Sequence, residues 1–474
     1  MGQAPSALEN CINAVGNGRT GFVGYPSNPL YQLQWVKPYN LDVSVTPAAV
    51  VRPQTAQDIS LVIQCANANG KKVQAKSGGH SYANYGLGGA NGAVAIDMVN
   101  FQHFRMDNVT WQATVGAGTR LGEVTKKMHD AGGRAMAHGV CPDVGTGGHA
   151  TIGGLGPMSR MWGSCLDHVL EVEVVTADGK VQRASNTQNS DLFWGLKGAG
   201  ASFGVITEFV FRTHPEPKSV VQYSYTFSFG KQADMAPIYS SWQDLIADPK
   251  FDRRFGTMFI MFPLGAIITG TFYGTQAEYE ASGIPAKLPK TSNSTLAVND
   301  WLGSLVHDAE TEALYLSNLA TPFYSKSLAF TKDTLIPTKS FKDLFTWVDN
   351  ADKGTLLWFI IFDAAGGAIN DVAPDATSYG HRDKLLFYQS YVVGFPLLGK
   401  TKDFVTGFHN QILAKAPAGA TGTYAGYVDP ALTDGQQQYW GGNLDRLMQL
   451  KSKWDAGDLF HNPQSVRLPG AKRR

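Results

Sequence analysis

The 474-residue chain has no long apolar run and no excess of either charge. Its uninterrupted apolar stretches all fall short of the roughly 18 residues that a membrane-spanning helix needs. Lys and Arg together number 40 and Asp and Glu number 39, so the formal net charge is +1. That balance gives no electrostatic basis for binding nucleic acid or an anionic membrane surface. We therefore expect a chain that binds neither.

Internal repeats and low-complexity segments are also missing from the chain. Apolar residues make up 43% and charged residues 17%, proportions that are ordinary for a globular protein. Because the chain is longer than one hydrophobic core usually supports, we expect an enzyme-sized protein of two lobes.

Cysteine is scarce, with four residues at positions 11, 65, 141 and 165. Cys11 lies in a short apolar segment and Cys65 in a strongly helical one. A bridge between them would close a loop of roughly 54 residues and stabilise the fold by about 4 kcal/mol in the chain-entropy model. Cys165 has apolar neighbours and is expected to be a buried thiol. The alternative is that all four thiols are free.

Two Asn-x-Ser/Thr sequons lie at Asn108 and Asn293. Like a disulfide, N-glycosylation at such a sequon is typical of proteins that pass through the oxidising secretory pathway. No signal peptide precedes the first residues, MGQAPSALEN, and we expect a leader to have been removed and Met1 added. The interpretation is a secreted, extracellular protein. Chance occurrence of both sequons is the alternative.

Glycine is the residue in excess, because 52 residues are about 11% of the chain where about 7% is usual. The excess is concentrated between Gly78 and Gly204. His80 lies in SGGHSYANYG and Cys141 in HGVCPDVGTGGHATIGGLGP. Since glycine has no Cβ, the backbone there can approach a large, flat or phosphate-bearing group closely. The two segments therefore predict a cofactor cradle.

The first part of the chain predicts alternating strands and helices. A strand at 48–53, a helix opened by Thr55 with Asp58 as capping partner, and a strand at 72–77 indicate a βαβ-like unit. Residues 168–185 predict a hairpin that turns on Asp178-Gly179, both suited to positive φ. The remaining predicted elements are strands at 92–98, 111–118 and 205–214, a helix at 121–131 closed by Gly132, and a helix at 191–198 capped by Ser190.

A shift in composition follows Pro215 and Pro217, after which aromatic residues and alternating strands predominate. This pattern predicts a second lobe built on an antiparallel sheet. The predicted fold class is α+β, with a cofactor lobe at 1–215, a substrate lobe at 216–430 and a tail at 431–474 that returns to the first lobe.

Two alternative sites share the glycine-rich residues. A nicotinamide site needs G-x-G-x-x-G between a strand and a helix, but Pro142 and Pro157 interrupt the run and it has no helical period. A metal site formed by His80, His138, His149 and Cys141 would have a spacing that matches no known ligand pattern. We therefore predict neither a Rossmann site nor a metal.

Five motifs, in order along the chain, closely resemble those of one flavoprotein family. They are similar to the berberine bridge enzyme-like branch of the vanillyl-alcohol oxidase (FAD-binding PCMH-type) superfamily, and nearest to fungal oligosaccharide oxidases. The match covers most of the chain. The motifs are K-S-G-G-H-S-Y at 76–82, H-G-x-C-P-D-V-G-x-G-G-H-x-x-x-G-G-x-G-P at 138–157, D-L-F-W-x-L-K-G-x-G-x-x-F-G-V at 191–205, Y-W-G-x-N-x-x-R-L at 439–447 and W-D-x-x-x-L-F-x-x-P-Q-S at 454–465.

The resemblance implies FAD attached at two points, with His80 joined to the 8α-methyl group and Cys141 to C6. Backbone amides would hold the pyrophosphate, and two covalent bonds would make the flavin a stronger hydride acceptor. The implied cofactor-binding residues are Ser77, Gly78, Gly79, His80, Ser81, Cys141, Pro142, Val144, Gly145, Gly148, Gly153, Gly154, Val205, Tyr439 and Asn443.

The resemblance also implies the electron acceptor. Members of the family that use oxygen tend to carry a small residue three positions after the cysteine, and here that residue is Val144. This favours an oxidase that reduces O2 to H2O2. A dehydrogenase that passes its electrons elsewhere is the alternative.

For the catalytic base, relatives use the tyrosine of a Y-x-N motif. Tyr424 falls on that position in TYAGYVDP, and Gly426 stands where asparagine is expected. Because a tyrosine has a resting pKa near 10, it needs help from charge or hydrogen bonds. Asp363 aligns with an aspartate that pairs with the tyrosine in oligosaccharide oxidases. We predict Tyr424 as base and Asp363 as its assistant.

The predicted substrate is an alcohol, foremost the C1 hydroxyl of a saccharide, oxidised by a monomeric enzyme. Tyr82 and Gln389 match substrate-side positions of the family, whereas Phe359 and Ile361 replace polar or aromatic sugar-binding residues. This apolar wall leaves a non-carbohydrate alcohol open as the substrate. Because the Y-x-N motif is broken, a further hypothesis is a flavin-loaded binding protein with vestigial catalysis.

Overall fold

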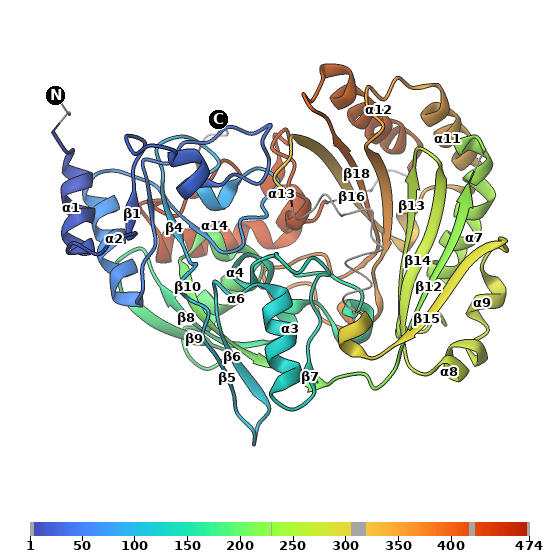
Figure 1. Ribbon diagram of the computed structural model, residues 1–474, viewed down its shortest axis with the longest axis horizontal. Helices are drawn as coiled ribbons and strands as arrows, with labels where there is room; N and C mark the ends of the chain where they lie inside the picture. The colour runs from blue at the N-terminus through green and yellow to red at the C-terminus, as the bar shows by residue number, and fades with distance from the viewer. Residues whose placement is uncertain (1–3, 229, 305–318, 417–421, 472–474) are drawn as a thin grey trace.

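The computed structural model describes residues 4–228, 230–304, 319–416 and 422–471, and it has two lobes side by side (Figure 1). The first lobe holds strands β1 to β11 together with the C-terminal helices α13 and α14. The second lobe holds strands β12 to β18 and helices α7, α8, α9, α11 and α12. Two large hydrophobic cores fill the lobes separately. None of the described helices is long and apolar enough to cross a membrane.

A four-stranded sheet with the order β1-β2-β4-β3 forms one part of the first lobe. The predicted βαβ unit is present, because β2 and β3 both run parallel to β4 and are connected by α2. Thr55 and Asp58 form the predicted capping box at the start of α2. The bounds are β1 Val23–Gly24, β2 Ala49–Val51, α2 Ala56–Ala68, β3 Val73–Lys76 and β4 Val94–Asp97.

The N-terminal helix α1 (Ala7–Gly16) packs against α2, and a disulfide joins Cys11 to Cys65. The predicted bridge is thereby confirmed, and Cys165 is a buried free thiol as expected. Burial raises the pKa of this thiol well above its usual range. The two sequon residues Asn108 and Asn293 are both exposed.

An antiparallel sheet with the order β5-β6-β10-β8-β9 forms the other part of the first lobe. The predicted β8–β9 hairpin is present, but only Gly179 of the turn has a positive φ. Thr176 and Lys180 close a three-residue loop, so the expectation of positive φ at Asp178 is wrong. The bounds are β5 Phe104–Met106, β6 Gln112–Gly116, β8 Val169–Val175, β9 Val181–Ser185 and β10 Val205–Arg212.

Both short helices predicted for the rest of this lobe are present, and two that were not predicted, α4 (Thr146–His149) and α5 (Ser159–Trp162), lie in and after the glycine run expected to have no helical period. Helix α3 (Leu121–Asp130) ends just before Gly132, which has a φ of +127°. Helix α6 (Ser190–Ala199) begins one residue earlier than expected, because Asn189 occupies the N-cap in the left-handed region and makes no side-chain cap. Ser190 is therefore the first helical residue and not the cap. A two-stranded ladder pairs β7 (Arg134–Ala135) with β11 (His214–Pro215).

The second lobe is built on a seven-stranded antiparallel sheet with the order β15-β12-β14-β13-β17-β18-β16, as predicted. Helices α7, α11 and α12 cover its outer face, on the right and top of Figure 1. The bounds are β12 Val220–Ser228, α7 Ala236–Ala247, β13 Phe255–Phe262, β14 Gly265–Tyr273, α8 Gln276–Ala281, α9 Ile284–Lys287, β15 Asn293–Asn299, β16 Phe323–Thr331, α11 Phe341–Asn350, β17 Trp358–Ala364, β18 Lys384–Val393 and α12 Gly399–Lys415.

The strand period of two divides the residues of this sheet between its faces. Phe259, Phe362 and Tyr388 belong to the core under the helices. Ile361 lies opposite Ile260 on β13 and opposite Gln389 on β18, and these three residues face the first lobe. The central strands thus supply one wall of the space between the lobes.

The C-terminal segment returns to the first lobe through α13 (Gly435–Trp440) and α14 (Leu444–Trp454), drawn in red in Figure 1. Lys451 anchors it, because its buried Nζ donates to the carbonyl oxygens of Ser202 and Phe460 and to the carboxylate of Asp455. Phe460 also forms a β-bridge with Val73 next to the first sheet.

Candidate active site

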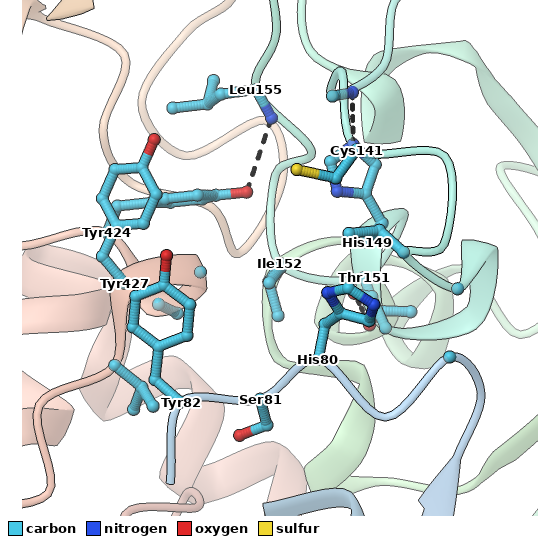
Figure 2. A pocket seen from close by; sticks show the side chains of 18 of the residues that line it. His80, Ser81, Tyr82, Cys141, His149, Thr151, Ile152, Leu155, Tyr424 and Tyr427 are labelled. Carbon is cyan, nitrogen blue, oxygen red and sulfur yellow. Dashed lines mark hydrogen bonds between the residues drawn. The ribbon is translucent and has the colours of Figure 1, made fainter. Parts of the chain in front are cut away.

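One cavity of about 390 Å³ lies between the two lobes and is lined by residues of the first lobe, the second lobe and the C-terminal segment. His80 and Cys141 lie on the first-lobe side, and Tyr82, Tyr424 and Tyr427 lie across from them (Figure 2). The cavity is therefore where the sequence-predicted attachment residues and the predicted base come together.

His80 lies in the loop after β3, with its ring stacked on Tyr39 at a centroid distance of 4.6 Å. Burial lowers the pKa of His80 to about 4, although Asp143 opposes this shift. The imidazole is thus neutral at physiological pH and keeps a nitrogen lone pair that can form a bond. Cys141 is half-buried, is not in the disulfide, and its sulfur points into the cavity (Figure 2).

The two glycine-rich loops touch each other at Gly78 and Gly145. A Cβ on Gly145 would collide with the nitrogen of Gly78, and a Cβ on Gly78 would collide with the nitrogen of Gly145. Within the described part of the chain, the backbone N–H groups of Ser77, Gly78, Gly79 and His80 donate no hydrogen bond. Unused N–H groups in a glycine loop make a concave site for phosphate oxygens, so these residues fit a dinucleotide.

Most of the predicted cofactor residues line this cavity, and five do not. Gly153 and Gly154 lie behind it, where Gly153 leaves room for the rings of Tyr379 and Tyr424. Val205 is fully buried in the first-lobe core. Asn443 donates to the carbonyl oxygen of Pro374, and Pro142 packs against Gly122. The residues that do line the cavity are Ser77, Gly78, Gly79, His80, Ser81, Cys141, Val144, Gly145, Gly148 and Tyr439.

Tyr424 is buried, and its phenol oxygen accepts a hydrogen bond from the N–H of Gly154 at 2.9 Å. The N–H of Leu155 points at the same oxygen at 3.4 Å, which Figure 2 marks with a dashed line. Burial raises the pKa of Tyr424 to about 12, and the two N–H donors oppose that rise. Both donors favour the charged form, so they stabilise the phenolate of Tyr424.

Asp363 lies on β17, one strand repeat beyond Ile361, and also lines the cavity. Burial raises the pKa of this carboxyl to about 7, and the Arg160 guanidinium opposes the rise. Arg160 is buried and donates to the carbonyl oxygens of Phe255 and Ala365. No hydrogen bond connects Asp363 with Tyr424 among the described residues, so the predicted assistance is not a direct contact here.

The substrate-side residues form one hydrogen-bonded group and one apolar surface. Gln389 donates to the hydroxyl oxygen of Tyr82 at 3.0 Å and lies 3.3 Å from that of Ser325. Ile361 lines the cavity beside them. Phe359 does not line it and packs instead against a hydrophobic cluster formed by Tyr39, Phe323, Tyr391 and Val393.

Sequence reasoning missed several residues that line the cavity. Tyr39 and Tyr427 stack near Tyr82, each at a centroid distance of 6.3 Å. Met258 and Ile260 enter from β13, and the alternation of that strand was the only signal that could have found them. His149, which was considered from the sequence only as a metal ligand, also lines the cavity. Its Nε2 accepts a hydrogen bond from the N–H of Gly139, and burial lowers its pKa to about 3.

Comparisons of the sequence with known proteins identify FAD-linked relatives. Residues 47–185 match the model of the FAD binding domain, and residues 423–467 match that of the berberine and berberine-like family. The chain is 38% identical to the FAD-linked oxidoreductase sorD of Penicillium rubens, over 98% of this chain and 99% of that protein. It is 34% identical to a carbohydrate oxidase of Microdochium nivale, over 97% and 95% of the two chains.

Solved structures give the same result. A chitooligosaccharide oxidase superposes with a TM-score of 0.89 at 29% identity, over 98% of this chain and all of that one. A glucooligosaccharide oxidase from Acremonium strictum, which carries a 6-S-cysteinyl, 8α-N1-histidyl FAD, superposes with a TM-score of 0.87 over 98% and 99% of the chains at 29% identity.

The fold and the cavity define a two-lobe flavoprotein oxidoreductase of the vanillyl-alcohol oxidase type. Within that class, the chain belongs to the berberine bridge enzyme-like family of FAD-linked oxidoreductases.

Proposed function

We propose that the chain is a secreted, monomeric oxidase that converts the C1 hydroxyl of a saccharide into a lactone. FAD joined to His80 and Cys141 would supply the hydride acceptor. The saccharide loses two hydrogens, and O2 takes them up as H2O2. The proposal depends most on one arrangement, in which His80 and Cys141 face Tyr424 across a single cavity that Gln389 also lines.

Tyr424 is proposed to take the hydroxyl proton. General-base catalysis requires a group that reaches the proton and that can be unprotonated before the step. The N–H groups of Gly154 and Leu155 meet this second need, because they stabilise negative charge on the phenol oxygen. Asp363, whose pKa is near 7, can hold a proton or release it at physiological pH.

Several polar groups of the second-lobe wall can orient a saccharide. Gln389, Tyr82 and Ser325 form a connected hydrogen-bonding group beside the cavity. Tyr82 and Tyr427 present aromatic rings with an interplanar angle of 27°. Related proteins named as carbohydrate, xylooligosaccharide and glucooligosaccharide oxidases support this substrate class.

A second candidate substrate is a less polar alcohol. Met258, Ile260 and Ile361 form a continuous apolar surface on the same sheet wall. A sugar hydroxyl placed there without a partner loses about 1 to 3 kcal/mol. This observation favours an aromatic or aliphatic alcohol that keeps the same hydride chemistry.

Peroxide release during turnover tests the proposal. The panel contains mono- and disaccharides of glucose, xylose and N-acetylglucosamine, together with benzyl alcohol and a long-chain aliphatic alcohol. We expect the highest kcat/KM for a saccharide. A higher value for benzyl alcohol would establish the second candidate. If no compound of the panel gave peroxide, the result would favour a flavin-loaded binding protein.

The electron acceptor needs its own measurement. The enzyme is reduced anaerobically with its best substrate and then mixed with air-saturated buffer. Rapid recovery of the oxidised flavin spectrum is expected, because Val144 keeps a small side chain beside Cys141 in the cavity. If the oxidised flavin spectrum recovered slowly in air but quickly with an artificial dye, the enzyme would be a dehydrogenase and not an oxidase.

A further inference from the structure

A second cavity, of about 500 Å³, lies behind the loop that carries His80. It shares only Lys76, Ser77 and Gly78 with the cavity between the lobes, so this stretch separates the two. All of its other lining residues belong to the first lobe, on the left of Figure 1. Neither His80 nor Cys141 lines it. Apart from the three shared residues, the cavity is therefore distinct from the proposed flavin site.

Positive charge is concentrated in this second cavity. Five cationic side chains and a single carboxylate, Asp97, line it, although the whole chain carries a formal charge of only +1. Two of the cations have partners outside the lining, since Arg19 pairs with Asp58 and Arg120 pairs with Asp143. The other three are Lys37, Arg52 and Lys76, and among the lining residues they have only the charge of Asp97 to balance them.

Asp97 does not neutralise these three cations. Its carboxylate lies 3.1 Å from Lys76 Nζ and 3.4 Å from Arg52 Nε. Lys37 Nζ has no hydrogen bond or ion pair among the described residues. After burial, the largest cause, the charges of Arg52 and Lys37 also lower the pKa of Lys76. The three cations and Asp97 together therefore carry a net charge of +2 that no other lining residue balances.

Lys37 is exposed and its backbone conformation is unusual, whereas the Arg52 side chain is fixed by contacts. Residues Gln32–Val36 form a π-helix, and Lys37 ends it in the left-handed region with φ 47° and ψ 64°. A lysine in that region is unusual, and rare backbone conformations persist where the surrounding structure requires them. Arg52 stacks on Trp35 at 4.3 Å and donates through Nη2 to the Gln34 carbonyl. Its Nη1 has no partner among the described residues and remains free to donate.

We propose that this cavity binds the phosphate group of a small organic molecule. Guanidinium and ammonium groups with free N–H donors are the usual ligands of phosphate oxygens. Since one water takes up about 30 Å³, the cavity has room for more than an inorganic phosphate ion. Because Ser77 and Gly78 form its inner wall, the bound phosphate stabilises the loop that carries His80.

Calorimetric titration of the flavin-loaded protein tests this site, because the flavin then already fills the other cavity. The probes are glycerol 3-phosphate, inorganic phosphate and uncharged glycerol, in a phosphate-free buffer of constant ionic strength. We expect glycerol 3-phosphate to bind with a Kd below about 1 mM, a range typical of small ligands, and glycerol not to bind. Equal affinity for inorganic phosphate would show that the site takes the free ion.

Variants of Lys37 separate binding from folding. Lys37→Asn removes the charge and places in the left-handed region a residue that tolerates it. It should raise the Kd at least about tenfold, the usual loss for a charged hydrogen bond, whereas Lys37→Arg should retain binding. Lys126→Asn, at an exposed lysine of α3, is the matched control and should bind as the wild type does. Unchanged affinity in Lys37→Asn, or no heat with either phosphate, would overturn the proposal.

Discussion

The ring of Tyr424 lies directly over Gly426, so close that a Cβ at position 426 would overlap with Cε1 of the tyrosine. The glycine that breaks the expected Y-x-N motif is therefore what allows this ring position. From it, the phenol oxygen reaches the N–H groups of Gly154 and Leu155. In this chain the position of the proposed base therefore depends on the same glycine that departs from the family pattern.

Adding a side chain at this glycine should displace the base. We expect Gly426→Ala to lower kcat about 100-fold, because a misplacement of about 1 Å in a catalytic group can cost that much. Gly442→Ala is the control, since no atom lies within 4 Å of the Cβ that it would introduce. Steady-state kinetics give kcat for both variants. Equal values of kcat would show that Gly426 does not position Tyr424.

Removing the phenol oxygen should affect the chemical step more than binding. Tyr424→Phe keeps the ring that packs against Phe387 and Tyr427 but has nothing to accept the hydroxyl proton. We expect kcat to fall by about 10²- to 10⁴-fold, the usual contribution of a general base, with little change in KM. A large rise in KM at unchanged kcat would instead indicate a binding role.

Asp363 should make stability depend on pH in a predictable direction. Its pKa is raised from 3.8 to about 7 in the folded state. Between about pH 4 and pH 7 the folded chain thus binds more protons than the unfolded chain at this residue, and its contribution to stability is lost as pH rises through 7. We expect Asp363→Asn to melt higher than the wild type at pH 8, by more than at pH 5.

That prediction is checked by thermal melts of the two proteins at both pH values, with Asp371→Asn as an exposed control. If the difference between wild type and variant is the same at pH 5 and pH 8, the carboxyl is already ionised in the folded state. The same variant should also change the pH profile of kcat near pH 7 if Asp363 exchanges a proton during turnover.

Two independent anchors should hold the flavin. We expect His80→Ala and Cys141→Ser each to retain yellow colour after acid precipitation, and the double variant to lose it. Mass spectrometry of proteolytic peptides should show the flavin mass on the peptides that contain His80 and Cys141. Colourless precipitate from the wild type would refute covalent attachment while leaving non-covalent FAD binding intact.

The disulfide should account for a measurable part of the stability of the first lobe. It joins residues 54 positions apart, and the chain-entropy model gives about 4 kcal/mol for a loop of that length. The double variant Cys11→Ser/Cys65→Ser should therefore melt at a lower temperature than the wild type under oxidising conditions. A reducing agent should lower the melting temperature of the wild type and leave that of the double variant unchanged.

Local patterns in the sequence were enough to predict much of the fold. The capping pair Thr55 and Asp58, the glycine after α3 and the strand alternation of the second lobe are all short-range signals, and the structure confirms each of them. The errors were also local. Asn189 and Ser190 both suit a helix start, and only the left-handed backbone at Asn189 decides between them.

The site was less predictable because its walls come from distant parts of the chain. The glycine context singled out His80 and Cys141, and the motif singled out Tyr424. Nothing local could show that the N–H groups of Gly154 and Leu155 meet the tyrosine, since they lie 270 and 269 residues before it. Phe359 illustrates the opposite case, because it has the strand phase of Ile361 but lies beyond the end of the cavity.

The return of the C-terminal segment to the first lobe has a consequence for biosynthesis. Asn462, Gln464 and Ser465 line the same cavity as Gln74, so residues almost 400 positions apart form one wall. A nascent chain still held in the ribosome tunnel would lack this closing wall. Enclosure of the cavity is therefore expected only after residues 462–465 have left the ribosome.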